Sequence, residues 1–180
     1  IALMNKRAKE LGCTNTNFHN PHGLNDDKHT TTARDLSIIA RAALRYPDLR
    51  EAAKAKTYTV SRSLDTKDTF LKTKNPLLMK DLVDGIKTGW TVPAGKCFVG
   101  TVEREGTRLI TVVLNSQNWS EDTMTLLDWA YSHFERKKVL TKETIVGEVA
   151  LKGASKPTLR LVAGEELVGL VRAAEPDGVQ

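Results

Sequence analysis

Apolar side chains recur at helical spacing through the first quarter of the chain. A first apolar stripe predicts a helix over residues 1–11, which Gly12 ends as a C-cap. The stripe consists of Leu3, Met4, Ala8 and Leu11. The polar residues 13–31 follow, and their Asn-Pro-His-Gly turn predicts a loop before the next helix. In this loop we expect His22 to form hydrogen bonds within the turn.

A second helix is predicted to follow this loop and to end at Tyr46. Thr32 provides an N-cap and Asp35 an acidic side chain in the first turn. The apolar stripe of this helix consists of Leu36, Ile39, Ala40, Ala43 and Leu44. Pro47 ends it and opens a short third helix, which reaches about Ala53.

From residue 56 onward the pattern changes to that of β-strands. The β-prone runs are residues 57–60, 69–71, 85–88, 97–102 and 107–114, with a polar turn between the first two. Glu105-Gly106 predicts a tight hairpin turn between the last two runs, because Gly adopts positive φ at little cost. Residues 109–114 are almost continuously apolar, and we therefore expect that strand to be covered on both faces.

The last third of the chain begins with one more helix. Ser120 is the expected N-cap, and the aromatic residues of the stripe are expected to pack against the sheet. The stripe consists of Met124, Leu127, Trp129, Tyr131 and Phe134. The charged residues 135–138 predict a break. We accordingly divide the chain into a domain of residues 1–136 and an incomplete β-rich domain of residues 137–180.

The β-prone runs of the second domain are short. They cover residues 144–151, 158–162 and 167–171, separated by Gly153, Pro157 and Gly164. So few residues cannot bury a self-sufficient core. Helices and antiparallel strands together make the fold class α+β, with a small all-β domain beginning at the C-terminal end.

Composition narrows the classes of function. The chain has 180 residues, of which 40% are hydrophobic and 27% charged, and its formal net charge is +5. The positive charges are spread out, so no nucleic-acid partner is predicted. No run of about 18 apolar residues is present that would span a membrane. Cys13 and Cys97 lie far apart and indicate neither a disulfide framework nor a CxxC site.

Lys87-Thr88-Gly89 is the motif that most clearly carries chemistry. A K-T-G element at a sheet edge lines the active site of penicillin-interacting serine enzymes. The edge offers backbone N–H and C=O groups to a peptide-like substrate. Lys87 adds positive charge near the nucleophile, Thr88 can bind a substrate carboxylate, and Gly89 leaves room for close approach. The plain alternative is a surface strand with a turn.

Six segments in order, the K-T-G motif among them, give the chain a family resemblance. It resembles the low-molecular-mass penicillin-binding proteins, which are serine-type D-alanyl-D-alanine carboxypeptidases, over roughly residues 1–135. The segments are residues 17–24, 32–36, 75–78, 84–91, 94–97 and 108–114. The resemblance implies the penicillin-binding-protein/β-lactamase-like fold, an antiparallel sheet flanked by helices. The final β-prone stretch resembles the beginning of that family's C-terminal β domain.

Two of the family's three catalytic elements are missing from this sequence. No serine is followed by Lys at the third position, as the S-x-x-K element requires; the serines are Ser37, Ser61, Ser63, Ser116, Ser120, Ser132 and Ser155. Ser116-Gln117-Asn118 spells S-x-N but follows K-T-G instead of preceding it, so we interpret it as a strand-end turn. We therefore expect the C-terminal part of such an enzyme, inactive by itself.

For the complete enzyme the resemblance implies acyl transfer from a peptidoglycan stem peptide to a serine. Lys87 would give electrostatic support, Lys87, Thr88 and Gly89 would bind the substrate, and the backbone N–H of Trp90 would donate to the oxyanion. An Arg that the family often uses for the terminal carboxylate is absent between residues 115 and 119. β-Lactams would acylate the same serine, and no metal or organic cofactor is expected.

The resemblance also implies partners and a location. We expect the chain to associate with the missing N-terminal half or with another copy of itself, because the apolar face of residues 109–114 would otherwise be exposed. The expected location is extracytoplasmic, with membrane contact only through anchor segments that are absent here.

Several alternatives stay open at this point. A non-catalytic cell-wall-binding or scaffolding relative would keep the K-T-G half-site, and a β-lactamase would share the motif. Residues 89–97 approximate a phosphate-binding loop, although five residues separate the glycines and Cys97 replaces Ser or Thr. A zinc site is also conceivable, but its ligand spacing matches no usual pattern. Its ligands would be Cys13, His19, His22 and His29.

Overall fold

The computed structural model describes residues 1–62, 67–153 and 158–173. Two compact units divide the chain, Ile1–Leu127 and Asp128–Gln180. The elements of the first unit are α1 Ala2–Glu10, α2 Ala33–Ala43, α3 Pro47–Lys54, β1 Thr57–Val60, β2 Thr69–Lys72, α4 Pro76–Met79, β3 Gly85–Thr91, β4 Gly95–Arg104, β5 Thr107–Val113 and the start of α5, Trp119–His133.

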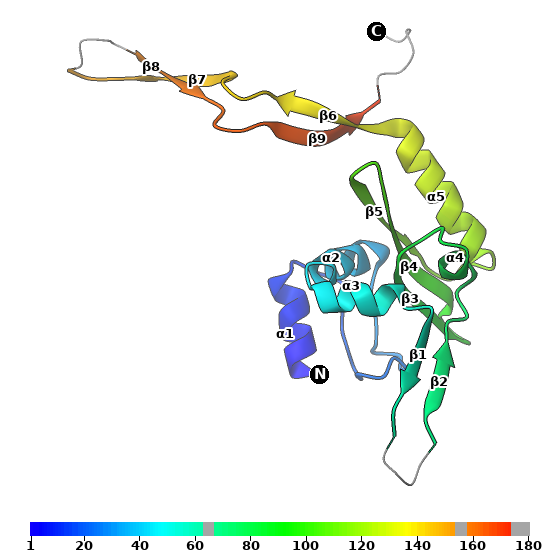
Figure 1. Cartoon of the computed structure of the whole chain (residues 1–180). Helices are drawn as coiled ribbons and strands as arrows, with labels where there is room; N and C mark the ends of the chain where they lie inside the picture. The colour runs from blue at the N-terminus through cyan, green and yellow to red at the C-terminus, as the bar shows by residue number, and fades with distance from the viewer. Residues whose placement is uncertain (63–66, 154–157, 174–180) are drawn as a thin grey trace. The chain divides into compact units, whose positions relative to one another are not determined.

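A three-stranded antiparallel sheet in the order β3-β4-β5 forms the centre of the first unit (Figure 1). Glu105 and Gly106 both have positive φ at the turn between β4 and β5, which confirms the predicted tight hairpin. Helices α2 and α3 pack on one face of this sheet, α2 against β5 and α3 against β3. Antiparallel strands, with helices packed on the sheet, confirm the α+β class.

The opposite face of the sheet is covered where α5 begins. Phe98 is 1% exposed, and its ring centroid lies 4.9 Å from that of Trp119. Side chains alternate along β4, so Thr101 points to the other face, where its methyl group and Ala53 both come close to Gly85. Phe98 and Leu127 are the largest fully buried apolar side chains among the described residues, each 1% exposed or less.

Two polar side chains fix the loop of residues 13–31 to the helices on either side. The side-chain amide of Asn5 in α1 donates to the Phe18 carbonyl at 2.8 Å and accepts from the Phe18 N–H at 2.7 Å. Asp35 in α2 is 1% exposed and accepts hydrogen bonds from the Asn15 N–H at 2.8 Å and the Thr16 hydroxyl at 2.7 Å. The long polar loop is thus a defined structure.

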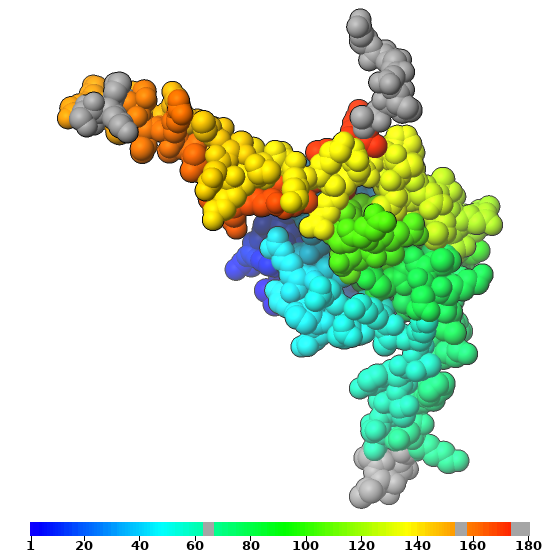
Figure 2. All heavy atoms as spheres, turned by 45° about the horizontal axis from the view of Figure 1, so that its top comes forward, coloured from blue at the N-terminus to red at the C-terminus, as the bar shows by residue number. Residues whose placement is uncertain are grey.

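Strands β1 and β2 form a separate antiparallel hairpin, visible as the cyan-green arm of Figure 2. Tyr58 and Phe70 remain 65% and 66% exposed on it. The polar turn predicted within this hairpin lies partly outside the described residues. The predicted turn residue Pro157 and the last seven residues of the predicted second domain lie outside them as well. A short helix that we did not predict, α4, follows Asn75, whose side chain accepts from the N–H groups of Leu77 and Leu78.

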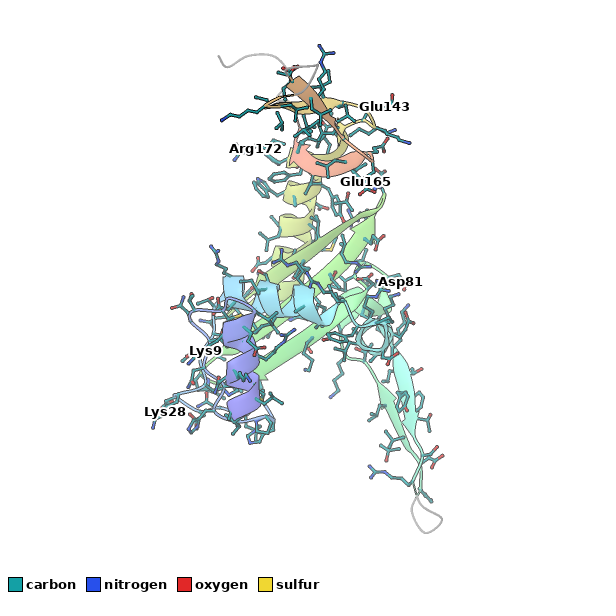
Figure 3. The ribbon with its side chains drawn as sticks, turned by 90° about the vertical axis from the view of Figure 1, so that its left-hand side faces the viewer. Lys9, Lys28, Asp81, Glu143, Glu165 and Arg172 are labelled. Atoms are coloured by element: carbon teal, nitrogen blue, oxygen red, sulfur yellow. The ribbon has the colours of Figure 1, made fainter. Side chains whose placement is uncertain are left out.

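The second unit contains β6 Phe134–Leu140, β7 Ile145–Ala150, β8 Thr158–Val162 and β9 Leu167–Arg172. They pair as two antiparallel ribbons, β6 with β9 and β7 with β8. Figure 3 labels Glu143, Glu165 and Arg172 in this unit. Among its described residues none is classed as buried, which agrees with the expectation that so short a segment buries no core.

Three local predictions are wrong. Residues 135–138 do not break the chain but belong to β6, because each pairs with a residue of β9. Ser120 lies inside α5, since the helix already begins at Trp119. Helix α2 ends at Ala43 instead of Tyr46, and i→i+3 hydrogen bonds close the remaining residues into a turn.

Two predictions of burial also differ from the structure. Trp129 is not a core residue: it is 53% exposed and stacks on His133, with the Phe134 ring edge-on to it. Strand β5 is not covered completely, because Leu109, Ile110 and Val112 are only half-buried. The predictions for residues 135–138, Trp129 and β5 failed for a common reason. Each depends on which segments lie next to one another in the fold, and a short stretch of sequence does not contain that information. The domain division at residue 136 stays a prediction.

Candidate active site

The K-T-G motif lies where the sequence predicts it, on an edge of the sheet. Lys87, Thr88 and Gly89 pair with Val99, Phe98 and Cys97 of β4, and within the described part of the chain no strand pairs with the other side of β3. One edge of β3 is therefore open to a peptide-like ligand.

The four residues of the predicted site are all exposed. Lys87 and Gly89 alternate with Thr88 and Trp90 on the two faces of β3, and Trp90 is 67% exposed. The ammonium group of Lys87 donates a hydrogen bond to the carbonyl of Thr88. The nearest atom to a Cβ placed on Gly89 would be Cys97 Cβ at 3.9 Å. The structure thus brings the four residues together on one accessible strand.

A cavity of about 230 Å³ borders the first half of β3. Residues 85–88 form one wall, and the end of α3 with Thr73 and Asn75 forms the other. Lys87 and Thr88 both line it. Two of the three K-T-G residues therefore border this space.

An ion-pair network holds the beginning of β3 to the rest of the sheet. Arg108 on β5 contacts Asp84 at 2.8 Å and Glu103 at 2.8 Å, and it donates to the Thr101 hydroxyl at 3.0 Å. The N–H of Asp84 in turn donates to the Thr101 carbonyl at 2.8 Å. The Arg108 side chain is 24% exposed. Burial lowers the pKa of Arg108, whereas the hydrogen bonds to Asp84 and Glu103 raise it. The second effect is the larger in sum, so the pKa of Arg108 lies above its ordinary value.

A second cavity, which the sequence did not predict, lies at the other end of β3. It has a volume of about 160 Å³ and is lined by residues 23–26 and His29 of the long loop and by residues 89–91, Ala94 and Cys97 of the β3–β4 hairpin. Residues so far apart in sequence meet only through the fold. The only feature of the sequence that pointed to this cavity was the polar character of the loop of residues 13–31.

Within this loop the predicted hydrogen bonding of His22 is confirmed. Its Nδ1 accepts from the Leu24 N–H at 3.1 Å, and the Asn20 side chain accepts from the Gly23 N–H at 2.8 Å. His19 Nδ1 lies 2.7 Å from Asp26 Oδ2. A hydrogen bond from the backbone N–H of Lys28, and then that from His19, lower the pKa of Asp26.

The competing sites of the sequence analysis have different structures. Residues 89–97 form the β3–β4 hairpin and do not lead into a helix, so they are not a phosphate-binding loop. Ser116 accepts from the Asn118 N–H at 3.0 Å and bonds to Asp122, which confirms a turn after β5. Over the described ranges, no three His, Cys, Asp or Glu side chains gather as metal ligands. Over the same ranges, no helix is long and apolar enough to cross a membrane.

Comparison with known proteins gives the family. The sequence model of the D-alanyl-D-alanine carboxypeptidases matches residues 1–118. D-alanyl-D-alanine carboxypeptidase DacF of Bacillus subtilis is 29% identical over 178 residues, which are 97% of this chain and 46% of that protein. The chain therefore spans about half the length of the curated relatives it matches.

Solved structures give the same result. Penicillin binding protein 5 from Haemophilus influenzae has a TM-score of 0.79 and 27% identity, covering 97% of this chain and 51% of that chain. A penicillin-binding protein from Listeria monocytogenes, solved in its cefotaxime-bound form, has a TM-score of 0.62 and 33% identity, covering 71% of this chain and 53% of that chain. The fold is thus that of the penicillin-binding proteins, and the chain belongs to the D-alanyl-D-alanine carboxypeptidase family.

Proposed function

We propose that the protein containing this chain is a serine-type D-alanyl-D-alanine carboxypeptidase, which removes the terminal D-Ala from peptidoglycan stem peptides. The observation that carries this proposal is the position of the K-T-G motif in a chain that belongs to this family. The motif lies on an exposed edge of the sheet, and no strand in the described part of the chain pairs with that edge. Such an edge binds an extended peptide through backbone hydrogen bonds. We place the reaction outside the cytoplasm, where its substrate is found.

The proposed reaction proceeds through an acyl-enzyme. A serine Oγ attacks the carbonyl carbon between the two D-Ala residues, and a lysine takes the serine proton. The backbone N–H of Trp90 donates to the oxyanion, together with that of the nucleophile. The C–N bond breaks, D-Ala leaves with the proton on its amine, and water then hydrolyses the ester. Lys87 supports this chemistry electrostatically and, with Thr88 and Gly89, binds the substrate end.

The nucleophile is expected outside these 180 residues, since none of the serines here begins S-x-x-K. We propose that the chain alone neither cleaves peptides nor forms a covalent adduct with β-lactams. It would do both when joined to the remaining part of the protein, which would supply the serine nucleophile.

Apolar surface on the first unit supports such a partner. Leu109, Ile110 and Val112 of β5 are half-buried. A second apolar surface is a groove of about 330 Å³ beside α1, where Leu3 is 76% exposed. Surfaces of this kind are typical of interfaces.

D-Ala release by the full-length protein tests the proposed activity. Lys87→Ala should lower kcat/KM for an acetylated lysyl-D-Ala-D-Ala peptide by about 100-fold, as losses of positioned charge in active sites do. The matched control is Lys9→Ala, an exposed lysine on α1 that Figure 3 labels, which should stay within twofold of the wild type. A Lys87→Ala protein with wild-type kcat/KM would contradict the proposal.

A non-catalytic, cell-wall-binding relative is the second candidate, and the missing S-x-x-K is the observation that favours it. The coding sequence upstream of Ile1 separates the two. S-x-x-K and S-x-N elements there would support the enzyme, and their absence would support the binding protein.

A further inference from the structure

The solvent-facing side of α2 carries three arginines, which we call the arginine row. Arg34 and Arg41 lie on the helix, and Arg45 lies in the turn that follows it, where its N–H donates to the Ala42 carbonyl at 3.3 Å. Their spacing of seven and four residues keeps them within about 40° of one another around the helix axis. All three are exposed, whereas the buried Ala40 belongs to the side that packs on β4 and β5.

No carboxylate of the described residues neutralises the arginine row. Asp35, the acidic residue of α2, is 1% exposed, and its carboxylate accepts hydrogen bonds from Asn15 and Thr16. Asp48 follows Arg45 by three residues, yet within the described part of the chain no arginine of the row forms an ion pair. The three positive charges of the row are therefore left to solvent or to a partner.

The charges of the row also repel one another. Arg41 and Arg45 are four residues apart, and like charges at this spacing destabilise a helix because their side chains are neighbours on its surface. An anion bound between the two guanidinium groups removes this repulsion. The row thus gains free energy from an anionic ligand that the described residues do not supply.

The chemistry and length of the row indicate the kind of anion. A guanidinium group presents its N–H donors in a planar fork, which matches two oxygens of one phosphate group. A rise of 1.5 Å per residue separates Arg34 from Arg41 by about 10 Å and Arg41 from Arg45 by about 6 Å along the axis. One small anion cannot reach all three arginines, whereas a flexible chain with a phosphate in each repeat can.

A polymer fits the row better than a membrane surface does. A helix that lies on a bilayer inserts apolar side chains among its cations. In α2, all of whose residues are described, no large apolar side chain is exposed. Tyr46 and Leu49 are the nearest exposed apolar residues along the chain, and both come after the row. A row one side chain wide therefore matches a linear partner.

We propose that the arginine row binds a phosphodiester polymer of the cell surface, with one phosphate group at each guanidinium group. Such binding holds the protein at the polymer without using the K-T-G strand, because the row lies on α2 and not on β3. The inference therefore goes beyond the proposed peptidase activity, and its test does not depend on that activity.

Binding of fluorescein-labelled poly(glycerol phosphate) to the full-length protein, measured by fluorescence anisotropy over a series of salt concentrations, tests the proposal. Arg41→Gln should raise Kd by about fivefold, the usual effect of one basic side chain at an anionic surface. It should also lower the slope of log Kd against log salt by about 0.7, since one fewer phosphate is neutralised. Arg41→Lys keeps the charge and should leave this slope unchanged.

The matched control is Arg62→Gln, which removes the same charge from an exposed position after β1 in the first unit. Its Kd and salt slope should stay within twofold and within about 0.2 of the wild-type values, respectively. Urea-unfolding curves that coincide with that of the wild type show that each variant is folded. A Kd for the polymer that is the same in Arg41→Gln as in Arg62→Gln would overturn the inference.

Two further probes separate the polymer from other sources of phosphate. The first is vesicles of phosphatidylglycerol and phosphatidylcholine, and the second is a single-stranded DNA oligonucleotide. The triple variant Arg34→Gln/Arg41→Gln/Arg45→Gln should lose more affinity for poly(glycerol phosphate) than for either probe. A larger loss with vesicles would assign the row to a membrane, a larger loss with DNA would assign it to nucleic acid, and either result would overturn the proposal.

Discussion

Replacing Arg108 by Met tests whether the ion-pair network fixes the start of the K-T-G strand. The guanidinium group joins three elements: Asp84 directly before β3, Thr101 and Glu103 on β4, and β5 itself. Met keeps most of the aliphatic volume but removes all the donors. The Thr101 hydroxyl still donates to the Leu109 carbonyl at 3.0 Å, so the main uncompensated group is the Asp84 carboxylate.

The magnitude follows from the exposure of each partner. Asp84 is 26% exposed and Arg108 24%, so their pair at 2.8 Å is partly desolvated, and losing hydrogen bonds to a charged group there costs about 1.5–3 kcal/mol. Glu103 is 48% exposed, and its pair contributes at most about 0.5 kcal/mol. We therefore expect Arg108→Met to lower the free energy of unfolding by about 2–3 kcal/mol.

Urea unfolding followed by circular dichroism measures this difference. Arg34→Met is the matched control, because this arginine is exposed in the first turn of α2 and its loss should cost less than about 0.5 kcal/mol. An Arg108→Met variant as stable as the control would refute the reasoning that this network anchors β3.

Two further predictions concern the core and the loop. Phe98→Ala should lower the free energy of unfolding by about 3–5 kcal/mol, whereas Phe70→Ala, 66% exposed, should cost under about 1 kcal/mol; urea titration compares them. Hydrogen bonds, that of Thr16 first, lower the folded-state pKa of Asp35 below its unfolded value of about 3.9. Its stabilising effect is therefore complete above that value and disappears as the pH falls through the folded-state pKa. Asp35→Asn should flatten the loss of stability between about pH 5 and 2; melting curves with the wild-type slope would contradict this.

The elements around the site could be predicted because their determinants are local. Thr32 accepts the N–H of Asp35 as the N-cap of α2, and Gly12 has φ +88° after α1, as a C-cap requires. Glu105 and Gly106 form the turn between the two clearest strands. The position of Lys87 on an open edge followed from the K-T-G context.

What could not be predicted depends on contacts between distant segments. The second cavity requires Asp26 to meet the end of β3, and hydrogen bonds of Asn5 and Asp35 fix the loop that brings it there. The charges of residues 135–138 suggested a break, but exposed ribbons accept charged side chains. Trp129 resembled a core residue by spacing alone and instead stacks on His133.

Fluorescent-penicillin labelling tests the central claim most directly, namely that this chain supplies the K-T-G half of a serine active site. The full-length protein and the 180-residue chain are labelled, separated on a denaturing gel and mapped by mass spectrometry. We predict a covalent adduct on a serine outside residues 1–180 in the full-length protein and no adduct on the chain alone. An adduct on any serine within the 180 residues, or none on the full-length protein, would contradict the account.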